Sequence, residues 1–145
     1  MNSTFTAIIG GTLLLGLSAG LAFASPISDP TAFCRAIADA VMKGDADQAI
    51  DLAMANEPDK SRERGAKAAI GTMVNTTKTF ASFGPMKFVE VPYERKLGKS
   101  VDSMILFYTT TATDIFVRCE LHDNGTGWRF NTMTINSDIT KLMSP

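Results

Sequence analysis

The period of the hydrophobic residues changes once along the chain, at Gly84-Pro85. Before this point, apolar side chains recur every three or four residues, the spacing that gathers them on one face of a helix. After it, they alternate with polar residues, as in strands that bury one face. The change predicts an α+β fold in which N-terminal helices pack on one side of a curved antiparallel sheet, as a cone or roll.

Three helices are expected before the change of period. Asp29 caps the first, with a proline next in the chain, and Gly44 ends it. Asp45 opens the second helix, which Glu57-Pro58 interrupts. The third is expected to run from about residue 61 to residue 83.

Strands and a final hairpin are expected after the change of period. The three strands are residues 86–93, 102–111 and 115–122. Pro92 marks the first of them as an edge or a strand end, because proline has no N–H to donate. The basic segment 95–99 is expected to be a turn. Asn124-Gly125 is a strong signal for a two-residue hairpin turn.

This turn fixes an expected register for the last hairpin. The face assigned to the core carries the pairs Leu121–Trp128, Cys119–Phe130 and Val117–Thr132. The other face carries His122 and the pairs Glu120–Arg129 and Arg118–Asn131. The charge match supports this register, because a slip of one residue would exchange the two faces.

Residues 1–24 are predicted to be a signal peptide. The apolar run 7–21 is followed by Ala22-Phe23-Ala24, with small residues at the −3 and −1 positions of a cut before Ser25. The alternative is an uncleaved membrane anchor, because the run approaches the length that spans a bilayer. Glycines within the run favour cleavage. We therefore expect an exported protein, periplasmic or secreted, with one α+β domain over residues 25–145 and no membrane span after cleavage.

The charges and cysteines argue against several classes of protein. With 14 Lys+Arg and 15 Asp+Glu, the chain lacks the basic excess of a general nucleic-acid binder. One His, two Cys and no Cys-x-x-Cys exclude a zinc ribbon or finger, and we predict no metal or cofactor. Residues 60–99 hold nine bases and three acids. This segment could face an anionic partner or membrane headgroups, but a solvated surface, or complementarity with a second protomer in a homodimer, is the favoured interpretation.

The two cysteines are predicted to form a disulfide. Cys34 lies on the inferred buried side of the first helix, and Cys119 lies on the inferred core face of the third strand. An exported chain meets oxidising conditions that permit this bond. The alternative is two buried thiols that pack as small apolar residues.

Ionisable residues near the sheet give one candidate ligand-binding site, formed by Tyr108, Asp114 and Arg118. We expect them to line a cleft and to orient a ligand through hydrogen bonds and charge. His122, the sole histidine, is expected to be a solvated surface residue, because a catalytic base needs positioned partners. We therefore assign no catalytic residue.

Four segments share a layout with a known superfamily. They are Ala32-Phe33-Cys34-Arg35-Ala36-Ile37, Gly44-Asp45-Ala46-Asp47-Gln48-Ala49, Phe83-Gly84-Pro85 and Gly127-Trp128-Arg129-Phe130. This layout, which covers nearly the whole mature chain, resembles the small exported members of the nuclear-transport-factor-two-like (cystatin-like cone) superfamily. The resemblance implies three helices followed by a meander of strands. The superfamily includes ketosteroid-isomerase-like enzymes, whose acid-and-base motif this chain does not match.

Two functions from different classes remain. The first is an exported non-enzymatic module that binds a small molecule or a protein partner. The second is a small enzyme of the isomerase, hydratase or cyclase type in the same cone. The sequence contains no recognisable nucleophile, metal set or acid–base motif, which favours the binding module.

N-terminal sequencing of the exported protein should begin at Ser25, because cleavage after Ala24 removes the apolar run. Recovery of chains that still carry Met1 from a membrane fraction would contradict this prediction and would identify an anchored protein.

Overall fold

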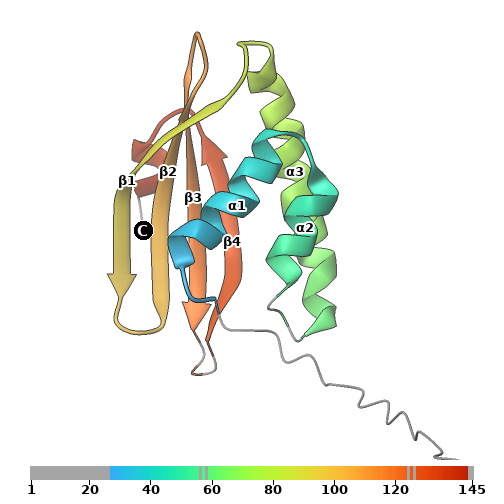
Figure 1. Ribbon diagram of the computed structural model, residues 1–145, viewed down its shortest axis with the longest axis vertical. Helices are drawn as coiled ribbons and strands as arrows, with labels where there is room; N and C mark the ends of the chain where they lie inside the picture. The colour runs from blue at the N-terminus through green and yellow to red at the C-terminus, as the bar shows by residue number, and fades with distance from the viewer. Residues whose placement is uncertain (1–26, 56, 58, 124, 126, 144–145) are drawn as a thin grey trace, which may run out of the picture.

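The computed structural model describes residues 27–143 except residues 56, 58, 124 and 126, so the predicted signal peptide lies outside the described residues. The elements are α1 (Pro30–Met42), α2 (Ala46–Met54), the 3₁₀ turn η1 (Lys60–Arg62), α3 (Glu63–Ala81), β1 (Lys87–Leu97), β2 (Val101–Thr109), β3 (Asp114–Asp123), β4 (Trp128–Asn136) and α4 (Thr140–Met143) (Figure 1).

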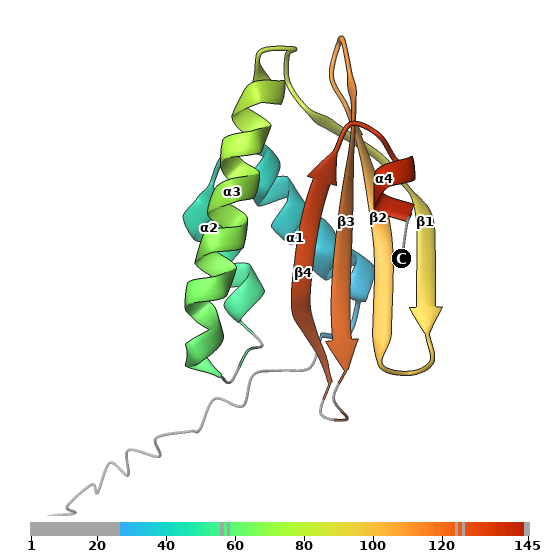
Figure 2. The ribbon, with the colours of Figure 1, turned by 180° about the vertical axis from the view of Figure 1, so that it is seen from behind.

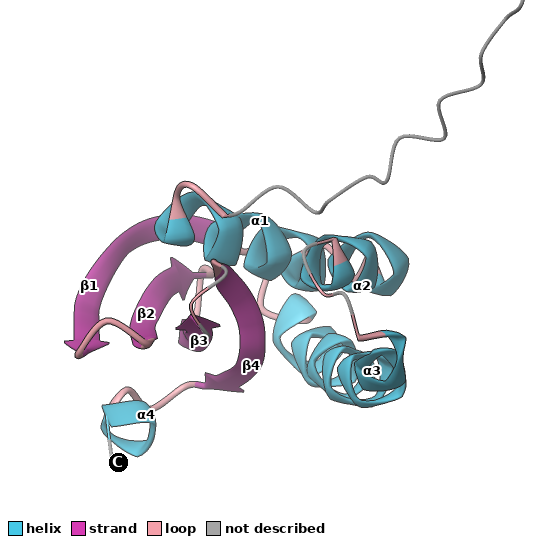
Figure 3. Ribbon diagram, turned by 90° about the horizontal axis from the view of Figure 1, so that it is seen from below, coloured by secondary structure: helices cyan, strands magenta, loops and turns pink. Residues whose placement is uncertain are grey.

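The strands form one antiparallel sheet in the order β1-β2-β3-β4. α1 lies against one face of this curved sheet, and α2 and α3 lie beside β4 (Figures 1 and 3). The short α4 lies on the opposite face, as the view from behind shows (Figure 2). The expected α+β fold, with helices followed by a curved antiparallel sheet, is confirmed.

Carboxylate caps begin the helical segments where the sequence places them. The Asp29 side chain accepts a hydrogen bond from the Ala32 N–H at 2.9 Å, and Asp45 accepts one from the Gln48 N–H at 3.0 Å. These bonds satisfy backbone donors that the first turn of a helix leaves unpaired. Gly44 lies in the connection between α1 and α2, and its φ of 79° is a conformation that favours glycine. Both predicted helix starts are therefore confirmed.

The hydrophobic core lies between α1 and the inner face of the sheet, which we define as the face that α1 covers. β2 and β3 contribute alternate residues to this core, because successive side chains of a strand point to opposite faces of the sheet. The buried side chains include Met104, Leu106 and Tyr108 from β2, Ile115, Val117 and Leu121 from β3, and Ile37, Ala38 and Val41 from α1. Burial of this apolar surface is the main term that favours the folded chain.

A disulfide joins Cys34 in α1 to Cys119 in β3, as the sequence predicts. Both residues are fully buried, and their Cα atoms lie 6.0 Å apart. The bond connects positions 85 residues apart, so it ties the first helix to the centre of the sheet.

The expected turn at residues 95–99 is wrong in its position. β1 continues through Leu97, which pairs with Val101, and the turn falls at Gly98 with a φ of 63°. β1 is an edge strand, so its charged side chains can stay in water and discourage pairing with another chain. Pro92 falls where the register of β1 with β2 shifts, as expected for a residue without an N–H.

The expected register of the last hairpin is also wrong. The structure pairs Leu121 with Phe130 and Cys119 with Met133. The last pair joins Asp123 to Trp128, so the connection is longer than two residues. The Asp123 carboxylate accepts hydrogen bonds within it from the Gly125 N–H at 2.8 Å and from the Gly127 N–H at 3.0 Å.

A bulge in β4 adds a further shift to this register. Glu120 pairs with Thr132 while the next residue, Leu121, pairs with Phe130, so Asn131 has no partner opposite it. Thr132 consequently lies on the outer face rather than in the core, and Glu120 does not pair with Arg129 across the strands.

Reduction of the disulfide should lower the free energy of unfolding by about 2–5 kcal/mol, because the cross-link restricts the unfolded chain. Urea unfolding with and without dithiothreitol measures this difference. A Cys34→Ala/Cys119→Ala variant is the control, since its midpoint should not respond to the reductant. Two titratable thiols in the unfolded, unreduced protein would show that the bond is absent.

Candidate functional site

Tyr108, the first predicted site residue, is buried on the inner face of the sheet. Its hydroxyl donates a hydrogen bond to Asp39 Oδ1 in α1 at 2.7 Å, and its ring meets the Phe88 ring edge-on. Burial raises the pKa of Tyr108, and the Asp39 carboxylate raises it further. The side chain therefore fixes α1 to the sheet as a neutral hydrogen-bond donor.

The other oxygen of Asp39 faces Arg35, whose Nε lies 3.6 Å from Oδ2. The Arg35 guanidinium in turn lies over the Phe88 ring, 3.9 Å from its centroid. Each polar group near Tyr108 thus has a partner within the domain. We interpret this cluster as a clamp between α1 and the β1–β2 pair.

Asp114 and Arg118 lie elsewhere. Asp114 is exposed at the start of β3, where it accepts a hydrogen bond from Thr109 Oγ1 at 3.0 Å. Arg118 lies on the outer face, where it pairs with Glu120 and donates to the Leu142 carbonyl of α4 at 3.2 Å. Tyr108 pairs with Ile115, three positions from Arg118 along β3, so the two side chains project from opposite faces. The structure does not bring the predicted set into one cleft.

The structure contains a cleft that the sequence analysis did not anticipate, bounded by α2, α3 and β4. Its volume is about 290 Å³. The apolar wall consists of Ala53 and Met54 from α2, Ala66 and Ala69 from α3, and Phe130 from β4. The polar lining comes chiefly from the connection between α2 and α3, with Glu57, Ser61 and Arg62.

Glu57 is the centre of the polar contacts in this cleft. Its side chain is 5% exposed, and its Oε2 accepts a hydrogen bond from Arg62 Nη1 at 2.7 Å. Its Oε1 accepts one from the Asp59 N–H at 3.1 Å and lies 3.9 Å from Arg129 Nη1. A buried carboxylate needs such partners, because loss of hydration is costly. Asp59 adds a second carboxylate to this network, so Arg62 and Arg129 face two acidic side chains.

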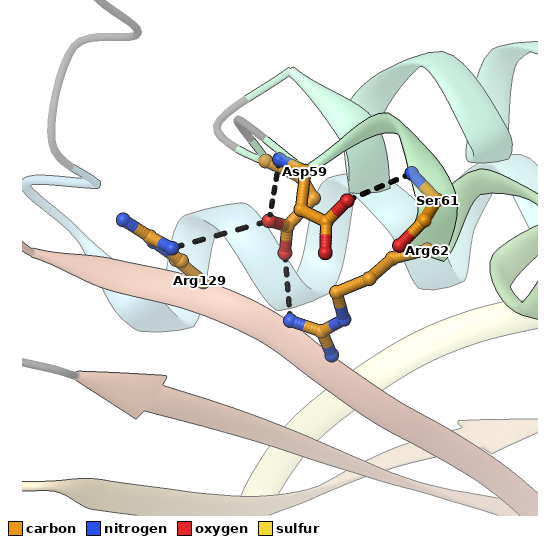
Figure 4. A network of polar contacts seen from close by, with 5 residues as sticks. Asp59, Ser61, Arg62 and Arg129 are labelled. Atoms are coloured by element: carbon orange, nitrogen blue, oxygen red, sulfur yellow. Dashed lines mark hydrogen bonds and ion pairs between the residues drawn. The ribbon is translucent and has the colours of Figure 1, made fainter.

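Asp59 and Ser61 shape the same connection. The Asp59 carboxylate accepts a hydrogen bond from the Ser61 N–H at 2.9 Å and so caps η1 (Figure 4). Hydrogen bonds from Ser61 lower the pKa of Asp59 below its usual value. The carboxylate therefore stays ionised at neutral pH and holds the turn that carries Arg62.

The cleft combines an apolar wall with a polar edge. The Glu57 carboxylate is engaged by the side chains of Arg62 and Arg129. Within the described residues, no cluster of three or more His, Cys, Asp or Glu side chains is placed to hold a metal ion. Among those same residues, no helix combines the length and the apolar character that crossing a membrane requires.

Asp102 is a second buried carboxylate, at the start of β2. It is 1% exposed, and neither of its oxygens has a hydrogen-bond partner among the described residues. Lys96 Nζ lies 4.0 Å from Oδ2 but only 3.2 Å from Glu94 Oε1. Burial raises the pKa of Asp102, the nearby Glu94 raises it further, and Lys96 opposes the shift.

This raised pKa predicts the sign of a pH effect. The folded protein binds the Asp102 proton more tightly than the unfolded chain does, so ionised Asp102 destabilises the fold above its folded pKa. Asp102→Asn should therefore raise the free energy of unfolding by about 1–3 kcal/mol at neutral pH. The gain should shrink as the pH falls toward about 4. Urea unfolding across this pH range measures it.

Glu90→Gln is the matched control for this substitution, because Glu90 is an exposed carboxylate of β1. Glu90→Gln should change the free energy of unfolding little at every pH. An Asp102→Asn variant with no gain at neutral pH, or with an equal gain at both ends of the range, would contradict the assignment.

The comparisons with known proteins found no match: no family model matches the chain, and no curated protein or solved structure is significantly similar to it. The resemblance to the nuclear-transport-factor-two-like superfamily therefore stays a prediction from the sequence.

Proposed function

We propose that residues 25–145 form an exported, non-enzymatic binding module, and that the cleft between α2, α3 and β4 takes a small molecule. The observation that carries this proposal is a hollow of about 290 Å³ with an apolar wall and a partly exposed guanidinium beside it. Ligand pockets in proteins combine an apolar lining with a few polar groups that orient the ligand. The volume lies at the lower end of their usual range, so the ligand is small.

Small side chains keep this cleft open. Ala53, Ala66 and Ala69 line it where two helices and a strand meet, and a Cβ added at Gly65 would meet no atom within 4 Å. Protein interiors are normally packed to the density of organic crystals. Space of this size next to the core therefore supports a role in binding. Met54, whose side chain is flexible, can adapt to the shape of an occupant.

The arrangement of charges supports binding over catalysis. Isomerases and hydratases of this size need an acid and a base whose pKa values are tuned for proton transfer. In the cleft, the carboxylate of Glu57 is instead neutralised by Arg62 and Arg129. The polar groups of the clamp around Tyr108 are engaged by a hydrogen bond to Asp39 and by the ion pair of Asp39 with Arg35.

Export is the second part of this proposal. It rests on the cleavage pattern before Ser25 and on the Cys34–Cys119 disulfide, a bond that oxidising compartments permit.

Filling the cleft tests the binding role. Ala66→Phe should place a ring in the hollow and abolish ligand binding, because Ala66 lines the apolar wall. Native mass spectrometry of protein purified from the exporting cells should show a co-purified small molecule, which this variant should lose. Titration with hexanoate, benzoate and hexanol extends the test to added probes.

Ala68→Phe is the control, because Ala68 is exposed on the same helix and does not line the cleft. It should retain the ligand and the probes. The proposal fails if the wild-type protein carries no small molecule and binds none of the probes, or if both variants bind as the wild type does.

A further inference from the structure

We infer that the ligand of this cleft is a small carboxylate, with Arg62 contacting its carboxylate group and the apolar wall holding its hydrocarbon part. The inference rests on the proposed function and deepens it, because it names the chemical class of the ligand and the residue that selects it.

Arg62 has hydrogen-bond donors to spare. Its guanidinium carries five N–H groups. Within the described part of the chain, the one contact of this group is the bond from Nη1 to Glu57 Oε2. The side chain lines the cleft and is 44% exposed, whereas that of Glu57 is 5% exposed. Arg62 can therefore offer a planar pair of donors to a carboxylate while Glu57 holds it in place.

The charge around the cleft favours an anion. Glu57 and Asp59 together balance the charges of Arg62 and Arg129, so the positive excess beside the cleft comes from the basic residues on either side of Arg62 in the chain. Lys60 and Arg64 lie beside Arg62 in the chain and add to the positive potential. Potentials of this kind raise the local concentration of oppositely charged ligands.

The apolar wall restricts the class further. Phe130, Met54 and the alanines offer contacts to a hydrocarbon chain or a single ring. An inorganic anion such as phosphate would leave this wall unfilled. A monocarboxylate with a short chain uses both parts of the cleft, so hexanoate is a suitable probe and hexanamide is its neutral counterpart of nearly equal shape.

Calorimetric titration of the disulfide-bonded mature protein tests the inference. Hexanoate should bind at least about tenfold more tightly than hexanamide, because a hydrogen bond to a charged group adds about 1.5–3 kcal/mol. Arg62→Gln should remove this preference. Arg62→Lys should restore part of it, because lysine keeps the charge but not the paired donors. Arg64→Gln is the matched control, because it removes a neighbouring positive charge but no residue of the cleft lining; it should weaken hexanoate binding only slightly and keep most of the preference.

A second variant protects the test against misfolding. Arg62→Gln leaves Glu57 with one partner fewer, whereas Arg62→Gln/Glu57→Gln removes both charges of the pair. The double variant should fold, should bind hexanoate no better than hexanamide, and should lose that residual binding when Ala66→Phe is added.

The outcomes separate this inference from the proposed function. Equal affinities of the wild type for hexanoate and hexanamide would overturn the carboxylate assignment and leave the binding role intact. Binding of neither compound would overturn the carboxylate assignment, and it would overturn the binding role as well if no small molecule co-purifies and benzoate and hexanol also fail to bind. A preference for hexanoate that survives Arg62→Gln, or phosphate binding as tight as hexanoate binding, would overturn the assignment of Arg62 as the residue that selects the ligand.

Discussion

The Cys34–Cys119 disulfide is the constraint on which the arrangement of the helices depends. α1 is the helix that packs across the inner face of the sheet, whereas α2 and α3 reach the sheet chiefly through β4. A domain of this size buries a limited core, and a covalent link between the helical layer and the central strands supplements it. The hydrogen bond between Tyr108 and Asp39 fixes the same helix at a second point. The position of α1 then sets where α2 and α3 can lie.

The cleft lies at the edge of this fixed region, between the ends of α2, α3 and β4. Its ion pairs are costly to bury, and a well-packed apolar replacement is often as stable as a buried salt bridge. Stability alone therefore explains the Glu57–Arg62–Arg129 cluster poorly. We propose that the cluster instead positions the Arg62 guanidinium, whose side chain is 44% exposed, beside the apolar hollow.

Local interactions made part of the structure predictable from the sequence. Asp29 and Asp45 cap their helices through hydrogen bonds to residues three positions away, so the neighbouring residues in the sequence suffice to locate the helix starts. The disulfide was predictable because both cysteines fall on faces that the hydrophobic period marks as buried. The edge strand was cut short in the prediction, because charged residues at 95–99 are equally typical of a turn and of an exposed edge. The hairpin register failed because the Asp123 side chain and a bulge, rather than the turn dipeptide, set it.

The cleft was missed for a physical reason. Glu57 was interpreted as part of a helix break, Arg62 as part of a basic segment, and Arg129 as a cross-strand partner of Glu120. Only the packing of α3 against β4 brings them together. The one local signal was a run of small residues, Gly65, Ala66 and Ala69, at helical spacing on α3.

The central claim is that ligand occupies the cleft beside Arg62 and neither the inner core nor the outer face. Chemical-shift mapping of the isotope-labelled mature protein during addition of hexanoate tests it most directly. The account predicts that the largest shifts fall on backbone amides of Ala53, Ala66 and Phe130, the three walls of the cleft. Shifts centred on Tyr108 in the core, or on Arg118 under α4, would contradict it.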